Sequence, residues 1–253
     1  MGTPEALALV TSLYEQRYSK KLPTHVAYLD LESAFCAVPH WAIKKTLERL
    51  NIPDWAIGLM DFIDAGAFTS VITAHGLTRT FKEETGVRQG CLLSPLKFIA
   101  WMDVLLYWLH DDASDIKLGG FDLHALAYAD DLWLVAASRQ ALQVKLDKAS
   151  AFSNYFGVHC NAGKSTYSTT ETGFDPGKTG HHKLYVSNLR TGTRTPLTAV
   201  LPTEAVKYLG VRLTLYNGST AQVRACSAQF YEWLQQLRRA RFGGPMIREM
   251  ARA

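Results

Sequence analysis

The sequence contains no uninterrupted apolar segment of eighteen or more residues, and its N-terminus has no charged stretch followed by an apolar core. These absences argue against a membrane-spanning helix and a secretory signal, so we expect an intracellular protein of the nucleus or cytoplasm, without a membrane partner. The scattered cysteines form no CxxC pair, which disfavours a zinc site and is consistent with free thiols. No internal repeat is evident, which excludes a solenoid.

The sequence also lacks a large excess of charge of either sign, because the net charge is only +4 over 253 residues. That excess lies in residues 224–253, which carry arginines 224, 238, 239, 241, 248 and 252 against Glu232 and Glu249. A basic tail on a balanced body suggests a polyanionic partner, although a solvated arginine-rich helix is equally compatible with charge alone. With 47% hydrophobic residues, the chain can bury a substantial core, as one domain with an appended subdomain.

Apolar periodicity and turn residues predict an alternation of helices and strands. We expect a buried strand from His25 to Asp30 and a long apolar helix from Ser94 to Trp108. A hairpin is expected across His75 and Gly76, and another across Tyr128–Asp131. Further predictions are helices opening at Thr3, Pro39 and Pro53, a helix over 138–156 closed by Gly157, strands over 183–186 and 206–215, and a last helix over 221–242.

The tetrapeptide Tyr128–Asp131 presents two adjacent carboxylates, Asp130 and Asp131, at the tip of an otherwise apolar hairpin. Adjacent carboxylates repel, so a divalent cation or cationic ligand is expected to neutralise them. Taken alone, such a doublet is more often a solvated turn, the interpretation we give to Asp111 and Asp112. A third carboxylate, Asp30, at the end of a predicted strand, makes a shared site the better hypothesis.

Nucleotidyl transfer requires a nucleophilic 3′-hydroxyl and neutralisation of the charge that develops on a triphosphate, and two divalent ions supply both. Asp30 and Asp130 could bridge two such ions, with Asp131 adjoining and the Leu31 carbonyl filling a further position. Magnesium prefers oxygen donors of this kind, so we expect two Mg²⁺ ions, with Mn²⁺ as a substitute.

Five ordered blocks carry a resemblance to the reverse transcriptases of non-LTR retrotransposons. They are YLDLESAFCAVPH at 28–40, GVRQGCLLSPLKF at 86–98, AYADDLWLV at 127–135, GVHCNAGKS at 157–165 and VKYLGVRL at 206–213. The resemblance implies an α+β right-hand polymerase palm, an antiparallel sheet backed by helices. It also implies a palm over 1–170, its end with primer-supporting strands over 171–215, and a basic, helical, thumb-like remnant over 216–253.

The resemblance also implies roles for individual residues. Asp30, Asp130 and Asp131 would be the metal-binding triad. Phe35 would lie under the incoming sugar and exclude a 2′-hydroxyl, although without the family it would be read as a core aromatic. Lys164 would lie near the leaving pyrophosphate, where the alternative is a solvated loop lysine.

Other implied contacts are with nucleotide and nucleic acid. Gln89 and Gly90 would form the turn against the incoming nucleotide and template, and the Leu31 carbonyl would join them in the nucleotide site. The primer end would be supported by Tyr208, Leu209 and Gly210. Backbone phosphates would be contacted by Arg224, Arg238 and Arg239.

The implied function is RNA-directed DNA polymerisation on an RNA or DNA template with a primer and deoxynucleoside triphosphates. Two departures from the family pattern stand beside it. Cys36 replaces a usual aspartate, and the chain begins just before the first carboxylate strand, so we expect the fingers, and any endonuclease segment, to be supplied elsewhere. The alternative is a domesticated or decayed module that binds nucleic acid or protein without catalysis. A palm-based cyclase has little support, because its Gly-Gly-acid hairpin is missing.

Overall fold

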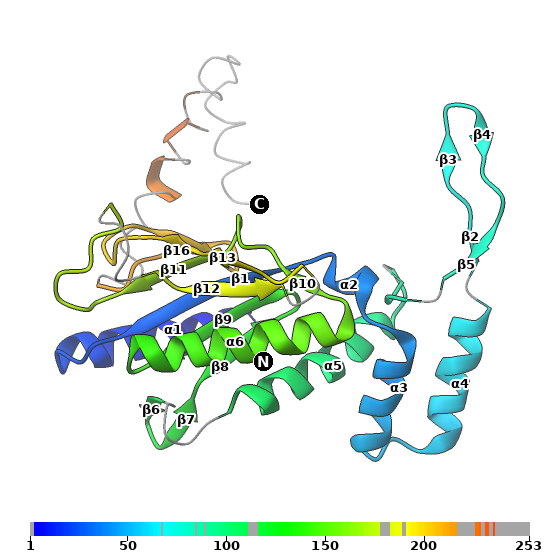
Figure 1. Cartoon of the computed structure of the whole chain (residues 1–253), viewed down its shortest axis with the longest axis horizontal. Helices are drawn as coiled ribbons and strands as arrows, with labels where there is room; N and C mark the ends of the chain where they lie inside the picture. The colour runs from blue at the N-terminus through cyan, green and yellow to red at the C-terminus, as the bar shows by residue number, and fades with distance from the viewer. Residues whose placement is uncertain are drawn as a thin grey trace, which may run out of the picture.

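The structure is a computed structural model that describes residues 3–66, 68–83, 85–88, 90–110, 116–177, 183–188, 191–216, 226–228, 231–232 and 235. Its core is a mixed sheet with helices packed on it, and a helical arm with a long hairpin projects to one side (Figure 1). The helices are α1 (Thr3–Ser19), α2 (Ala34–Ala37), α3 (His40–Arg49), α4 (Asp54–Ala65), α5 (Ser94–Leu109) and α6 (Arg139–Phe156).

The central sheet has the strand order β14-β11-β1-β9-β8, and β10 pairs with the far end of β1. Its strands are β1 (His25–Glu32), β8 (Ala125–Tyr128), β9 (Asp131–Ala136), β10 (His159–Cys160), β11 (Thr166–Thr169) and β14 (Thr198–Ala199). All pairs are antiparallel except β11 with β14, which is parallel. β1 therefore lies in the middle of the sheet, between β9 and β11.

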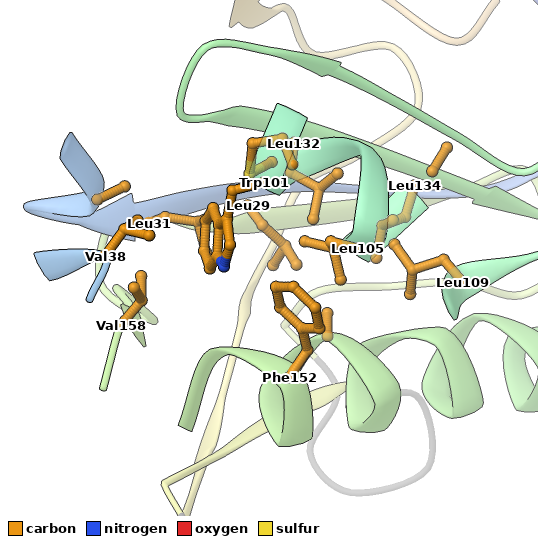
Figure 2. Packing of buried hydrophobic residues seen from close by; sticks show 14 of the residues in the cluster. Leu29, Leu31, Val38, Trp101, Leu105, Leu109, Leu132, Leu134, Phe152 and Val158 are labelled. Atoms are coloured by element: carbon orange, nitrogen blue, oxygen red, sulfur yellow. The ribbon is translucent and has the colours of Figure 1, made fainter. Parts of the chain in front are cut away.

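One face of this sheet packs against α5 and α6, and α3 packs in turn on α5. Alternate residues of β1 and β9, among them Leu29 and Leu134, belong to a buried cluster that also contains Trp101 and Phe152. Figure 2 shows the strand leucines gathered around Trp101, Leu105 and the ring of Phe152. Period-two alternation sends the intervening residues of each strand to the other face.

The opposite face is covered by α1 and by a second hairpin, β15 (Val206–Tyr208) with β16 (Val211–Leu213). Here Val26 and Trp133 pack with Leu13, Tyr14 and Tyr208 in a separate buried cluster. Since both faces are buried, β1 and β9 read as nearly continuous apolar runs in the sequence.

Helix α6 illustrates how local sequence sets an element's bounds. Ser138 is its N-cap, and the Ser138 hydroxyl accepts a hydrogen bond from the Ala141 N–H at 3.1 Å. Gly157 ends it in the left-handed conformation, at φ 77°. The helix predicted over 138–156 is thus confirmed.

The arm consists of α3, α4 and the hairpin that follows. Outer strands β2 (Phe68–Thr69) and β5 (Phe81–Lys82) pair, as do inner strands β3 (Ile72–Thr73) and β4 (Gly76–Leu77). A buried ion pair fastens the arm to the core, because Lys97 Nζ of α5 lies 2.8 Å from both carboxylate oxygens of Asp64 in α4.

Three sequence expectations need correction. The strand expected to end at Asp30 continues to Glu32, because β10 extends its pairing through Leu31. The arm hairpin turns at Ala74 and His75, one residue earlier than expected, since Gly76 already pairs with Thr73. The sheet is mixed, because residues of the 171–215 segment add β14 in parallel.

The remaining strands form two small hairpins, β6 (Ile116–Leu118) with β7 (Phe121–Leu123) and β12 (Tyr185–Asn188) with β13 (Thr193–Pro196). Leu184 and Leu197, beside β12 and β13, belong to the main core cluster. The described residues of 171–215 therefore share a core with the residues that precede them. Of the expected helix over 221–242, most residues, including Arg224, Arg238 and Arg239, lie outside the described ranges. Among the described helices, none is long and apolar enough to cross a membrane.

Replacement of Lys97 by methionine is expected to loosen the arm. The side chain of Lys97 is 4% exposed, and its loss leaves Asp64, 26% exposed, without its cation. We expect a loss of about 2 kcal/mol in unfolding free energy, below the usual cost for a fully buried pair because water reaches Asp64. Denaturant unfolding of Lys97→Met and of Lys97→Met/Asp64→Leu measures it. The double variant should recover part of the loss, and equal stability of the single variant and the native chain would contradict this role.

Candidate active site

The pairing of β1 with β9 places Asp30 directly opposite Asp131. The register runs from His25 opposite Ala136 to this acidic pair, without interruption. Asp30 lies two residues beyond Tyr28, so it shares the sheet face that α1 covers. The two carboxylates therefore lie on that face of the sheet, beyond the apolar residues that α1 covers.

The turn between β8 and β9 separates the two adjacent aspartates. Tyr128 pairs with Asp131, which leaves Ala129 and Asp130 as a two-residue turn. Ala129 has φ 53°, a left-handed conformation that costs an alanine about 1 kcal/mol. Only Asp130 is thus at the tip. The expectation that both carboxylates lie at the tip is wrong, because Asp131 is already part of the sheet ladder.

The loop before β11 is fixed to the backbone of Asp30. Asp30 donates its N–H to the Ser165 hydroxyl at 3.1 Å, and its carbonyl accepts the Asn161 N–H at 2.8 Å. Asn161 also shapes the loop, because its carbonyl and its side-chain oxygen both accept the Lys164 N–H, at 3.2 Å. These bonds hold the backbone of Lys164 near Asp30 while its side chain stays exposed.

A cavity of about 410 Å³ joins these elements. Asp30 and Asp131 line it from the sheet, Lys164 from the loop, and Tyr208 from β15. The remaining lining residues are Tyr28, Leu29, Leu132, Thr166, Val200, Ala205, Val206 and Lys207. Four of the expected site residues thus meet in one cavity.

The other expected residues stand differently. Asp130, Leu209 and Gly210 are next to lining residues but are not among them. The side chain of Leu31 is buried in the cluster on the opposite sheet face, so only its backbone could serve the site. Gln89 lies outside the described residues.

The carboxylates repel one another. The pKa of Asp131 is raised above its ordinary value, first by burial and then by the negative charges of Asp130 and Asp30. Within the described part of the chain, no ion pair involves any of the three, and no group of three or more acidic, histidine or cysteine side chains is close enough to hold a metal ion as it stands. An acidic site with uncompensated charge and oxygen donors fits a hard divalent cation.

Phe35 and the glycine-rich loop of residues 86–90 are held together around α2. Phe35, in α2, stacks on Phe98 with ring centroids 4.2 Å apart. Its carbonyl accepts the Val87 N–H at 2.6 Å, which fixes the loop to α2. Gly86, at φ +88°, lies so close to Cys36 that an added Cβ would be 2.7 Å from that residue's Cα. Gly90 has the same φ but open space around it, so it provides a turn and not a close approach.

Sequence reasoning missed a buried polar chain beside the carboxylates. Trp133 donates its ring N–H to the Tyr14 hydroxyl at 3.0 Å, and the Tyr14 and Tyr28 hydroxyls are 2.8 Å apart. Tyr28 and Trp133 are cross-strand partners, each two residues from an aspartate. This spacing is visible in the sequence, but the participation of Tyr14 depends on how α1 packs.

Comparison with known proteins adds a family match. The sequence model of the reverse transcriptase (RNA-dependent DNA polymerase) family matches residues 4–213. The retrovirus-related Pol polyprotein of type-2 retrotransposable element R2DM from Drosophila melanogaster is 32% identical over 212 residues, 81% of this chain and 18% of the relative. The corresponding polyprotein of type-1 retrotransposable element R2 from Nasonia vitripennis is 30% identical over 150 residues, 59% of this chain and 14% of the relative. The chain therefore spans less than a fifth of either relative.

Solved structures of similar fold include two telomerases. Apo telomerase from Candida tropicalis, truncated from its C-terminal domain, has a TM-score of 0.54 at 16% identity, covering 77% of this chain and 40% of that one. Telomerase from Candida albicans in complex with the TWJ fragment of telomeric RNA also has a TM-score of 0.54, at 10% identity, covering 84% and 33%. At these identities the likeness shows a shared polymerase-palm fold.

The two loop glycines make a matched pair for substitution. Gly90→Ala should cost about 1 kcal/mol, because only its positive φ is unfavourable. Gly86→Ala should cost about 3 kcal/mol, since its Cβ also collides with the backbone of Cys36. Denaturant unfolding of the two variants compares them, and equal losses would show that the close approach to α2 carries no weight.

Asp131→Asn is expected to stabilise the fold when divalent cations are removed. Because the pKa of Asp131 is higher in the folded protein, the unfolded chain ionises this carboxyl more readily. The free energy of unfolding therefore falls as the pH rises through 3.8, the ordinary pKa of an aspartate, and through the higher pKa of the folded state. At pH 7 the loss is complete, and the variant should melt about 1–2 °C higher, a small gain because solvent screens the charges. Melting curves in EDTA should show this gain disappearing near pH 3. A lower melting temperature at pH 7 would contradict it.

Proposed function

Because this chain belongs to the reverse transcriptase (RNA-dependent DNA polymerase) family, we propose that it forms the catalytic palm of an RNA-directed DNA polymerase. In this proposal it transfers a deoxynucleotide to the 3′-hydroxyl of a primer paired with an RNA or DNA template. The observation that carries the proposal is the cross-strand pair of Asp30 and Asp131, which opens into the same cavity as Lys164.

Asp30 and Asp131 would hold divalent cations, Mg²⁺ or Mn²⁺, with Asp130 and the Leu31 carbonyl as further donors. Bound cations supply the charge that activates a 3′-hydroxyl and stabilises a pentacoordinate phosphate. The pairing of β1 with β9 contributes rigidity, because both carboxylates project from a strand that is hydrogen-bonded on both sides. Rigid donors need little reorganisation as charge develops.

Lys164 would act on the leaving group. Its ammonium is exposed at the cavity while its backbone is held by Asn161, so the side chain can move over the phosphates without losing its anchor. There it would offset the negative charge of pyrophosphate or donate a proton to it.

Phe35 and the loop around Gly90 would position the nucleotide. The Phe35 ring is partly buried and stacked on Phe98, so it is a fixed surface against which a sugar can pack. A fixed ring would reject a 2′-hydroxyl by steric contact. Gln89 would complete this pocket together with Gly90.

Further residues would contact the primer and template. Tyr208 ends β15 and lines the cavity of the carboxylates, and Leu209 and Gly210 form the turn to β16. A primer end would lie against these three residues. Arg224, Arg238 and Arg239 would contact phosphates, as a sequence-independent and salt-sensitive attraction.

Primer extension on an RNA template with Mg²⁺ or Mn²⁺ tests this function. Asp30→Asn and Asp131→Asn should each lower extension about a thousand-fold, because several kcal/mol of cation-dependent stabilisation are lost. Asp122→Asn, on β7 and outside the cavity, is the matched control and should stay within about twofold of the native chain.

Duplex binding measured alongside separates the outcomes. If the native chain binds primer and template but extends no primer with either cation, the non-catalytic binding module is the better description. Extension by Asp30→Asn at the native rate would contradict the assigned site directly.

A further inference from the structure

Tyr208 carries a buried polar atom that has no partner. Its side chain is 3% exposed, and its hydroxyl makes no hydrogen bond within the described structure. Leaving such a group unpaired costs about 1–3 kcal/mol, so buried hydroxyls are normally bonded. Tyr208 lines the cavity while its hydroxyl is closed to solvent, so an acceptor for it has to come from a neighbouring side chain that turns toward it.

The neighbouring tyrosine does not supply that acceptor in this structure. The rings of Tyr28 and Tyr208 lie 5.6 Å apart and are tilted by 57°, but their hydroxyls are not hydrogen-bonded. The Tyr28 hydroxyl is joined to Tyr14, whose oxygen also receives the Trp133 N–H. Tyr208 therefore lies beside this polar chain without belonging to it.

Among the acceptors that line the cavity, the charged ones are the carboxylates of Asp30 and Asp131, and a charged acceptor makes the stronger hydrogen bond. Tyr208 lines the same cavity as Asp30 and Asp131. Its pKa is raised, first by burial and then by the negative charge of Asp131, with Tyr28 adding less. A tyrosine hydroxyl is protonated at neutral pH and can act as a donor. Within the described residues, no hydrogen bond engages the Asp131 carboxylate.

We propose that Tyr208 is a positioning residue, whose hydroxyl donates a hydrogen bond to the Asp131 carboxylate when that carboxylate turns toward Asp30 to hold a divalent cation. The proposal rests on the cation site of the proposed function. A ligating carboxylate has lone pairs beyond those facing the metal, and a neighbouring donor that occupies one of them fixes its orientation.

The geometry of β15 explains why the donor comes from Tyr208. The β15–β16 hairpin covers the same sheet face as α1, and Tyr208 is the residue of β15 that is buried in this cluster. Asp131 is on the same face, at the end of β9. The hairpin thus brings a hydroxyl donor into the cavity that the carboxylate pair lines.

Removal of the Tyr208 hydroxyl is expected to have an unusual effect on the melting temperature. Without a cation the hydroxyl is unsatisfied, so its removal should leave the fold unharmed. Tyr208→Phe retains the ring and its contact with Tyr28, and should melt at the same temperature as the native chain or higher, in EDTA. A hydroxyl with a purely structural role would instead lower the melting temperature when removed.

Affinity for Mn²⁺ alone, measured by electron paramagnetic resonance without nucleic acid, is the decisive readout. Tyr208→Phe should weaken Mn²⁺ binding about tenfold or more, the usual effect of losing a partner that orients a ligand. Primer extension by this variant should be restored as Mn²⁺ concentration is raised. Tyr185→Phe, which removes a hydroxyl from β12, is the matched control and should bind Mn²⁺ as the native chain does.

The outcomes that overturn the proposal are distinct. Native Mn²⁺ affinity in Tyr208→Phe refutes it, and weaker primer-template binding in that case assigns the acceptor to nucleic acid. A drop in melting temperature with unchanged Mn²⁺ affinity assigns the hydroxyl to the fold. Asp131→Asn distinguishes failure of the cation site from failure of the role of Tyr208. If Asp131→Asn also binds Mn²⁺ with native affinity, the cation site of the proposed function is wrong. If Asp131→Asn binds Mn²⁺ more weakly while Tyr208→Phe binds it with native affinity, only the role of Tyr208 is refuted.

Discussion

The antiparallel register of β1 and β9 decides which side chains meet at the end of the sheet. Residues of the two strands alternate between a face packed on α5 and α6 and a face packed on α1. A slip of one residue would point the Asp30 side chain into the apolar cluster beside α5 and α6 and would move Leu29 to the other face, so packing on the two faces fixes the register. The opposition of Asp30 and Asp131 is therefore a consequence of hydrophobic packing.

Loops complete the site by attaching to that fixed strand through backbone hydrogen bonds. The loop that carries Lys164 bonds to both the N–H and the carbonyl of Asp30, and the glycine-rich loop bonds to Phe35. Gly86 permits the second attachment, since a larger residue would meet the backbone of α2. Asp30 and Lys164, far apart in the chain, thus reach one cavity, while the glycine-rich loop is held against α2.

The same region contains several unfavourable interactions. Like charges raise the pKa of Asp131, Ala129 adopts a left-handed conformation, and the hydroxyl of Tyr208 is buried without an acceptor. Two buried hydrophobic clusters on either side of the sheet offset these costs. Their position around two carboxylates supports the proposed cation site, because strained and unsatisfied groups gather where a ligand is to bind.

The sequence alone was enough to predict the principal helices, the bounds of elements such as α6, and the family with its non-LTR relatives, which the comparisons confirm. These depend on local periodicity, caps and contiguous motifs. The three-dimensional packing was needed to show that Asp131 belongs to the ladder while Asp130 is in the turn, and that Tyr208 lines the same cavity as Asp30 and Asp131. The physical reason is that register and the packing of β15 are set by burial between segments about a hundred residues apart, which no local pattern encodes.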